Sequence, residues 1–154
     1  MLHAYAVAAD AFTSTPAERA ALPDSWWLKR VDDPDGLSAV FGAFCGEELV
    51  GTVALEFSAR SKTRHKAHLV GMFVSEPYRG QGIGCALLQQ ALQLVRAAAE
   101  IRVLSLTVTE GNGPAIRLYE SCGFQAFGVE PLAIATPDGL KSKVHMWLDC
   151  RRLL

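Results

Sequence analysis

Apolar residues follow two different periods along this chain, and the two periods alternate. An unbroken apolar run at 69–74 predicts a buried strand. Beyond it, apolar residues recur three or four positions apart, which predicts an amphipathic helix. A second strand-like run at 103–108 follows, and a further helical segment begins near residue 112. This order predicts a β-α-β crossover. The apolar positions of the first helix are Ile83, Leu87, Leu88, Ala91, Leu92 and Val95.

Shorter elements flank this crossover. Strands are predicted at about 38–45 and 49–57, joined as a hairpin, and two closing strands are predicted near 124–129 and 143–148. The combination predicts an α/β (α+β) fold with a mixed, mostly antiparallel central sheet flanked by helices. Since the sequence contains neither an internal repeat nor a low-complexity linker, we expect a single domain over residues 1–154.

Helix-start signals precede the hairpin. Thr15-Pro16-Ala17-Glu18 has the pattern of a capping box, with proline at the first helical position. A short helix is expected to follow and to end before Pro23. Asp24 is expected to cap a second helical piece that carries Trp26 and Trp27.

Composition changes this picture little. Half of the residues are apolar and a fifth are charged, which is typical of a chain with a hydrophobic core. Fifteen basic against sixteen acidic side chains give a net charge of −1, so a dedicated nucleic-acid binder is not indicated. The apolar stretches are too short for a membrane span, and the N-terminus lacks the basic start of a signal peptide. We therefore expect a cytoplasmic protein.

The cysteines are scattered and form no C-x-x-C pair. Cys45, Cys85, Cys122 and Cys150 are interpreted as reduced thiols. Neither a zinc site nor a disulfide framework is expected, and no metal is predicted.

Arg79-Gly80-Gln81-Gly82-Ile83-Gly84, the glycine loop, lies between the first predicted strand of the crossover and its helix. A glycine-rich turn at a helix start leaves backbone N–H groups unpaired, and the helix dipole makes that end positive. Such a turn suits a phosphate or pyrophosphate. A dinucleotide loop would read G-x-G-x-x-G, and its third glycine is missing here. A P-loop would end in Gly-Lys-Ser or Gly-Lys-Thr, whereas Ile83-Gly84-Cys85 has no lysine.

Two motifs give the chain a family resemblance. The glycine loop, preceded by Val74-Ser75-Glu76-Pro77-Tyr78, resembles the acyl-CoA pyrophosphate loop Q/R-x-x-G-x-G/A of the GNAT superfamily, the GCN5-related N-acetyltransferases. Residues 112–124 resemble that family's later motif, N-x-x-A-x-x-L-Y-x-x-x-G-F. The resemblance covers roughly residues 38–149 and implies the GNAT fold. Family members usually begin with an edge strand and a long first helix, and the N-terminal stretch here is short for both. Residues 2–9 are interpreted as the tail of that helix, with the first strand either abbreviated or missing.

The resemblance implies acetyl-CoA as co-substrate and a set of residues that bind it. The backbone N–H groups of Gln81 to Cys85 would hold the pyrophosphate in the space left by the glycines. Backbone N–H groups at a strand bulge, from Met72 to Val74, would stabilise the oxyanion. The implied cofactor-binding residues are Met72, Phe73, Val74, Arg79, Gly80, Gln81, Gly82, Ile83, Gly84, Cys85, Asn112 and Tyr119.

Tyr119 and Asn112 belong to the second motif. The resemblance implies that Tyr119 is the general acid that protonates the departing CoA thiolate. Asn112 is expected at a helix N-cap and, by the same resemblance, in contact with the cofactor.

The general base is open among several residues. Some protein-amine acetyltransferases of the superfamily carry a glutamate five residues before the asparagine, where this chain has Thr107. In the histone-acetylating branch a glutamate lies six residues before the last bulge position, and the same count from Val74 reaches His68. An imidazole suits a base at neutral pH, so His68 is the candidate base. The alternatives are Glu56, Glu110 and His145.

The basic loop, residues 60–66 (R-S-K-T-R-H-K), is interpreted as a solvated hairpin tip, with attraction of an acidic acceptor or a nucleotide phosphate as the alternative. One of Trp26 and Trp27 is expected to line an acceptor pocket and the other to lie in the core. We expect an N-acetyltransferase that transfers an acetyl group from acetyl-CoA to a primary amine by direct attack, with a small-molecule acceptor. The alternatives are a protein N-terminal or lysine acetyltransferase and a non-catalytic CoA-binding regulatory module. The expected partner is the amine acceptor, not a nucleic acid or a membrane, and a homodimer stays open.

Overall fold

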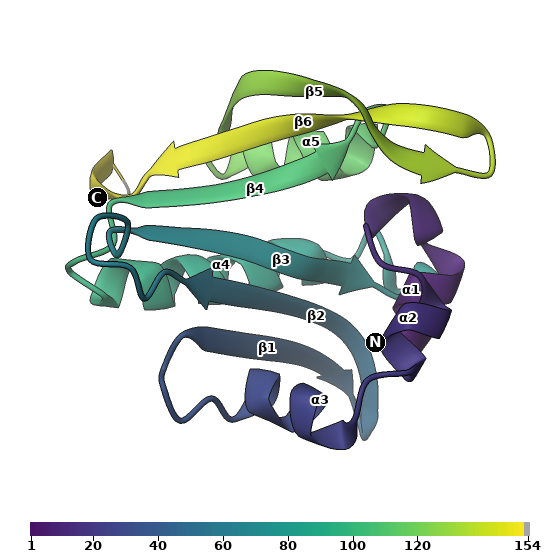
Figure 1. Cartoon of the computed structure of the whole chain (residues 1–154), viewed down its shortest axis with the longest axis horizontal. Helices are drawn as coiled ribbons and strands as arrows, with labels where there is room; N and C mark the ends of the chain where they lie inside the picture. Colours follow the sequence, from purple (N-terminus) through teal and green to yellow (C-terminus); the bar gives the residue numbers. More distant parts are fainter. Residues whose placement is uncertain (153–154) are drawn as a thin grey trace. The chain divides into compact units, whose positions relative to one another are not determined.

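The computed structural model describes residues 1–152, and the contacts within it group into two compact units. The loop unit comprises residues 24–104 and the chain from Asp149 onward, and it contains the glycine loop. The tyrosine unit comprises residues 1–23 and 105–148, and it contains Tyr119. Figure 1 labels the elements of both units.

The loop unit is built on three antiparallel strands. β1 (Ser38–Cys45), β2 (Glu48–Phe57) and β3 (Lys66–Val74) are hydrogen-bonded in chain order. α3 (Asp24–Val31) lies on one face of these strands and α4 (Ile83–Ala97) on the other (Figure 1). Two short 3₁₀ turns complete the unit, η2 (Glu76–Tyr78) and η3 (Cys150–Arg152).

The core of the loop unit lies where α4 packs on β2. Gly51 brings the two elements together, because a Cβ at this position would stand 3.0 Å from Leu87 Cδ1 and 3.1 Å from the Phe73 carbonyl oxygen. Val53 and Leu55 of β2 are fully buried. The buried face predicted for this helix is confirmed, since the buried residues of α4 are Leu87, Leu88, Ala91, Leu92 and Val95.

The tyrosine unit joins an N-terminal helical segment to a strand–helix–hairpin. β4 (Val103–Thr109) begins in the loop unit and continues here, followed by α5 (Gly113–Ser121). β6 (Gly139–Asp149) lies between β4 and β5 (Gln125–Thr136) and pairs antiparallel with β5. The N-terminal elements are α1 (Leu2–Val7), η1 (Ala9–Ala11) and α2 (Pro16–Ala20).

The closing strands are longer than predicted. The sequence pattern gave strands only near 124–129 and 143–148, whereas β5 and β6 extend to a tight turn at Pro137 and Asp138. The register of β5 shifts between Glu130 and Ile134, where Leu132 has a φ of 54°. Such an irregularity interrupts the alternation of side chains along the strand. The sequence pattern therefore predicts an end of the strand there, although the pairing of β5 with β6 resumes beyond it.

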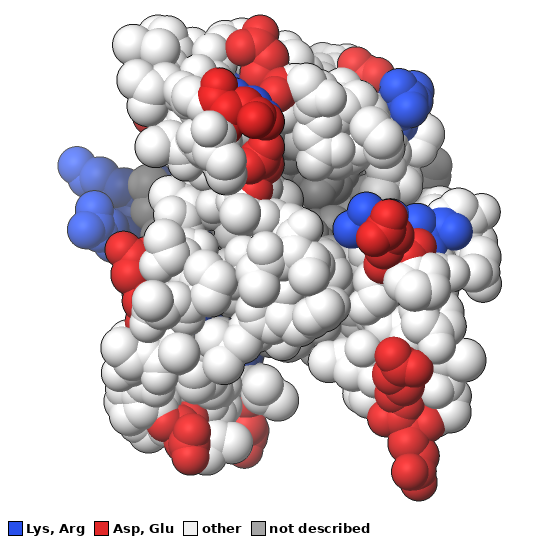
Figure 2. Space-filling model, turned by 90° about the vertical axis from the view of Figure 1, so that its right-hand side faces the viewer, with Lys and Arg blue, Asp and Glu red and all other residues white. Residues whose placement is uncertain are grey.

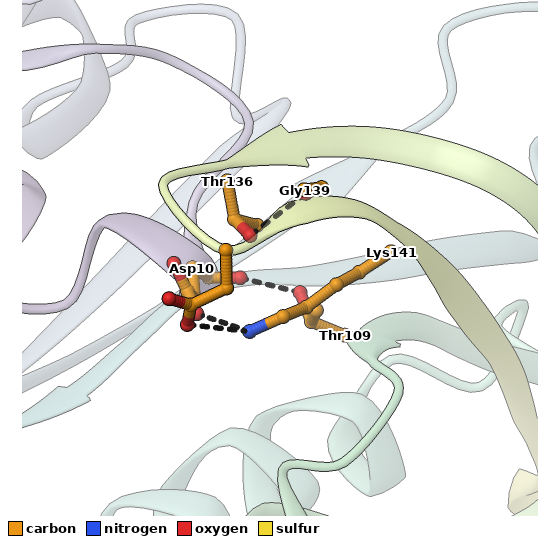
Figure 3. A network of polar contacts seen from close by, with 6 residues as sticks. Asp10, Thr109, Thr136, Gly139 and Lys141 are labelled. Carbon is orange, nitrogen blue, oxygen red and sulfur yellow. Dashed lines mark hydrogen bonds and ion pairs between the residues drawn. The ribbon is translucent and has the colours of Figure 1, made fainter.

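In the N-terminal segment, the short helix predicted after Thr15 is present as α2, and it ends before Pro23. The capping box is present, since Thr15 Oγ1 accepts a hydrogen bond from Glu18 N at 3.2 Å and Thr15 N donates to Glu18 Oε2 at 2.8 Å. Polar contacts fasten this segment to the rest of the unit (Figure 3). The Asp10 carboxylate pairs with Lys141 Nζ at 2.6 Å, and the Thr109 hydroxyl donates to the Asp10 carbonyl oxygen.

α3 corrects two expectations. Asp24 is the first residue of the helix and not its N-cap. Trp26 and Trp27 are both half-buried and meet edge to face at 5.0 Å, and neither belongs to the buried core of the described residues. An eight-residue helix at the edge of the sheet is too short to enclose either ring, so the expectation of one core tryptophan is wrong.

On the face drawn in Figure 2 most side chains are uncharged, and the charged ones stand in small groups, some of which contain both signs. Among the described residues, all four cysteines are free thiols. None of the described helices is both long and apolar enough to cross a membrane.

Candidate active site

The glycine loop has the backbone geometry of an anion-binding turn. Gly80 and Gly82 have φ values of 74° and 81°, in the left-handed region that favours glycine. Gly82 is also the N-cap of α4, and within residues 1–152 no side chain caps this helix end. The first N–H groups of α4 therefore have no partner inside the helix. A Cβ built on either glycine would meet no atom within 4 Å, so the space at these two Cβ positions is open.

Side chains of the loop turn back and hold its shape. Arg79 Nε donates to the Val74 carbonyl oxygen at 2.9 Å, and Gln81 Nε2 donates to the Pro77 carbonyl oxygen at 3.1 Å. The Arg79 guanidinium also lies 6.0 Å from the centre of the Phe73 ring. The loop thus presents its backbone, while these two side chains brace it against η2 and the end of β3.

The strand before the loop carries a bulge. Thr52 pairs with Phe73 and Ala54 with Val70, so Gly71 and Met72 together stand opposite a single residue of β2. Gly71 has a φ of 62°, which is the left-handed conformation of the glycine at the first position of a G1 bulge. The buried Thr52 hydroxyl donates to the Gly71 carbonyl oxygen at 2.9 Å. The bulge therefore starts one residue before the predicted positions, Met72 to Val74, and shares only Met72 with them. The oxyanion role of these three residues stays a prediction.

The position of Tyr119 is held by the hydrogen bonds that end α5. Phe124 N donates to the Tyr119 carbonyl oxygen at 3.1 Å, Gly123 N donates to the Glu120 carbonyl oxygen at 2.9 Å, and Gly123 has a φ of 91°. These two bonds and the left-handed glycine form a Schellman motif, which usually carries an apolar contact across the helix end. Here that contact joins the rings of Tyr119 and Phe124, whose centres are 5.8 Å apart.

Burial sets the acidity of this tyrosine. Tyr119 is 5 % exposed, and burial alone raises its pKa to about 12. Desolvation disfavours the phenolate, so the hydroxyl is protonated throughout the neutral range.

Asn112 fulfils its structural prediction. It is the N-cap of α5, and its Oδ1 accepts a hydrogen bond from Ala115 N at 3.3 Å. Contact of Asn112 with a cofactor stays a prediction.

The candidate base His68 is half-buried on β3, directly across from Glu56 of β2. Glu56 in turn forms an ion pair with Arg30 of α3, and the Arg30 guanidinium lies 4.7 Å from the centre of the Trp26 ring. Sequence reading missed Arg30, because an arginine on a short amphipathic helix gives no signal for a strand partner far along the chain.

The alternative bases lie in different settings. His145 Nε2 is 3.1 Å from Glu130 Oε2 on the β5–β6 hairpin, and Glu110 is exposed just after β4. Thr107 lies within β4. The glycine loop, the bulge and His68 thus belong to the loop unit, whereas Tyr119 and Asn112 belong to the tyrosine unit.

A family model described as the acetyltransferase (GNAT) family matches residues 3–124. The chain belongs to this family. It is 32% identical over 118 residues to streptothricin acetyltransferase of Escherichia coli, covering 75% of this chain and 64% of that protein. It is 26% identical over 105 residues to the L-amino acid N-acetyltransferase AaaT of Escherichia coli K12, covering 68% of this chain and 64% of that protein. The chain thus matches just under two thirds of the length of each of these two relatives.

Solved structures show the same fold. The structure of yncA from Salmonella typhimurium, determined with its cofactor acetyl-CoA, has a TM-score of 0.77 at 18% identity and covers 97% of this chain and 83% of that one. This likeness confirms the predicted GNAT fold and its mixed sheet.

Proposed function

We propose that this protein is an N-acetyltransferase that transfers an acetyl group from acetyl-CoA to the primary amine of a small molecule by direct attack. The observation that carries the proposal is the glycine loop, with two left-handed glycines, open space at their Cβ positions and an uncapped helix start. Family membership supports acetyl-CoA as the ligand of this loop.

The glycine loop fits a pyrophosphate. Unpaired N–H groups and the positive end of a 15-residue helix both favour an anion at this position. With Arg79 and Gln81 engaged by backbone carbonyls, the anion would be bound chiefly by main-chain donors of Gly82, Ile83, Gly84 and Cys85. Acetyl-CoA supplies the activated acyl group.

We propose that the oxyanion site is formed by the backbone of Met72, the second residue of the bulge, and of Phe73 and Val74, which follow it. A bulge interrupts regular pairing, and main-chain donors aimed at a developing oxyanion are worth roughly 3 kcal/mol each in a transition state. The Gly71 carbonyl is already engaged by Thr52, which fixes the bulge.

Tyr119 is proposed as the proton donor to the CoA sulfur. The amine forms a bond to the acyl carbon, the C–S bond breaks, and the sulfur takes the phenolic proton. The pKa of Tyr119 is about 12. A free thiol titrates near 8.5, so full transfer between these values would cost roughly 5 kcal/mol. Burial raises the pKa of a thiol as well, which narrows this gap. Tyr119 therefore donates as the C–S bond breaks, and not beforehand.

His68 is proposed to accept the proton that the amine loses. A pH–rate profile of the wild type against His68→Ala tests this role. We expect the acidic limb of kcat/KM to change in the variant, and an unmoved limb would exclude His68. Glu56→Gln serves as the comparison, because Glu56 lies opposite His68 but is already paired with Arg30.

A small-molecule acceptor is supported by the names of the two curated relatives, a streptothricin acetyltransferase and an L-amino acid N-acetyltransferase. Thr107 at the position of a family glutamate counts against acetylation of protein N-termini. The test is CoA release from acetyl-CoA with amino acids, amine antibiotics, polyamines and peptides as acceptors. Turnover only with peptides would replace the proposed acceptor class, and acetyl-CoA binding without any CoA release would indicate a regulatory module.

A further inference from the structure

Basic side chains from separate parts of the loop unit gather at the end of β3 that lies away from the glycine loop. The basic loop leads directly into β3. Arg102 N donates to the His65 carbonyl oxygen at 2.8 Å, and Cys150 N donates to the Arg102 carbonyl oxygen at 3.0 Å, so backbone hydrogen bonds join three segments. The five exposed cations of the basic loop and of Arg102 form the basic patch: Arg60, Lys62, Arg64, Lys66 and Arg102.

Residues 1–152 supply no ion-pair partner to the basic patch. Within residues 1–152, none of its five cations takes part in an ion pair, whereas Lys29 pairs with Asp35 at 3.5 Å and Lys141 with Asp10 at 2.6 Å. The carboxylate of Asp149, the residue before Cys150, is paired with Arg151. Clustered like charges repel one another in the free protein, and a bound anion relieves this repulsion.

The basic loop has a defined shape. Ser58 Oγ and Thr63 Oγ1 are 2.6 Å apart across its base. Thr63 N donates to the Arg60 carbonyl oxygen and Lys66 N to the Thr63 carbonyl oxygen, each at 2.9 Å. A backbone that is already ordered loses less conformational freedom when a partner binds.

The basic patch is separate from the glycine loop. The nine residues of β3 lie between the two, a strand length of about 26 Å. This is well beyond the screening length of about 8 Å at physiological ionic strength, so the patch exerts little attraction on an anion in the glycine loop.

We propose that the basic patch is an interaction surface for an acidic segment of another polypeptide. Three of its five cations are arginines, whose planar guanidinium binds a carboxylate through two parallel hydrogen bonds. A nucleic acid fits less well, because the whole chain carries a net charge of −1 and residues 58–66 contain no Phe, Tyr or Trp on which a base could stack. This surface is independent of the acetyltransferase reaction.

The test measures binding of a labelled peptide of alternating Glu and Gly to the full-length protein by fluorescence anisotropy, at low and at physiological salt. The test variant is Arg60→Gln/Lys62→Gln/Arg64→Gln. The matched control is Gln89→Glu/Gln90→Glu/Gln93→Glu, which lowers the net charge by the same three units on the exposed side of α4. We expect the peptide affinity to fall about tenfold or more in the test variant and with added salt, but not in the control.

Three results would overturn the proposal: no binding of the acidic peptide by the wild type, an equal loss of binding in both variants, or tighter binding of a short RNA duplex than of the peptide. Circular dichroism and CoA release confirm that both variants are folded, since neither replaces a residue of the active site. Patch-dependent peptide binding by a wild type that releases no CoA would support this surface and count only against the acetyltransferase proposal.

Discussion

Replacing Tyr119 by phenylalanine separates its chemical role from its packing role. The Phe124 contact and the Schellman hydrogen bonds involve the ring and the backbone, so Tyr119→Phe keeps both. If the hydroxyl is the general acid, we expect kcat to fall about 10²-fold or more while acetyl-CoA affinity stays unchanged. At neutral pH the loss of one hydroxyl should alter stability by less than about 1 kcal/mol.

The same variant has a signature in alkaline unfolding. The pKa of Tyr119 is about 12 when folded and near 10 when unfolded, so the neutral phenol is favoured by folding. This contribution is fully present below pH 10 and is lost as pH rises towards 12, a loss of roughly 3 kcal/mol. Tyr119→Phe has no phenol to ionise, so its free energy of unfolding does not include this loss. In urea unfolding measured from pH 8 upward, the stability of the variant relative to the wild type should therefore rise above pH 10.

Tyr5→Phe is the control, because it removes another phenol of the tyrosine unit outside the proposed machinery. Wild-type turnover in Tyr119→Phe would refute the general-acid role. A stability difference that does not change between pH 8 and pH 11.5 would refute the buried phenol itself.

Substitutions at three further positions probe other parts of the fold. Gly82→Val places a side chain in the open space of the glycine loop at a φ of 81°. It should abolish measurable acetyl-CoA binding in calorimetry and destabilise the fold by about 1–2 kcal/mol. Retained affinity would contradict a phosphate-binding site there. Gly51→Ala puts a methyl group 3.0 Å from a leucine of α4 and should lower the free energy of unfolding by about 1–3 kcal/mol in urea, with normal stability arguing against close packing. Asn112→Ala should cost about 1 kcal/mol through the lost cap of α5, whereas Asn112→Ser should recover most of it; an equal loss in acetyl-CoA affinity for both would point to cofactor contact.

Local signals in the sequence predicted a large part of the fold. The helical period of α4 identified its buried face, and the pattern at Thr15 to Glu18 identified a capping box that is present in the structure. Both signals work because the interacting groups lie within one or two helical turns of each other. The closing strands were underestimated, because β5 continues past an irregularity at Leu132 that interrupts its period.

The candidate site was predictable to a different extent. The glycine loop and the helix end after Tyr119 are short segments whose geometry is determined by their own glycines, so a motif is sufficient to find them. The surroundings of His68 depend on a register between β2 and β3 and on Arg30 of α3, which are far apart in sequence. Burial of Tyr119, and with it the pKa of its phenol, likewise arises only when distant elements pack together.

The Schellman motif after Tyr119 explains the residue spacing of a family motif. Three residues separate the tyrosine from Gly123 because the N–H of the residue after that glycine must reach the tyrosine's own carbonyl. One inserted residue would turn the helix by about 100° and aim the phenol elsewhere. The way the helix ends is therefore enough to require the spacing L-Y-x-x-x-G-F, whatever the tyrosine does in catalysis. A homologue that keeps Gly and Phe but replaces Tyr should still fold in this region, and an insertion should disable the site even with every motif residue present.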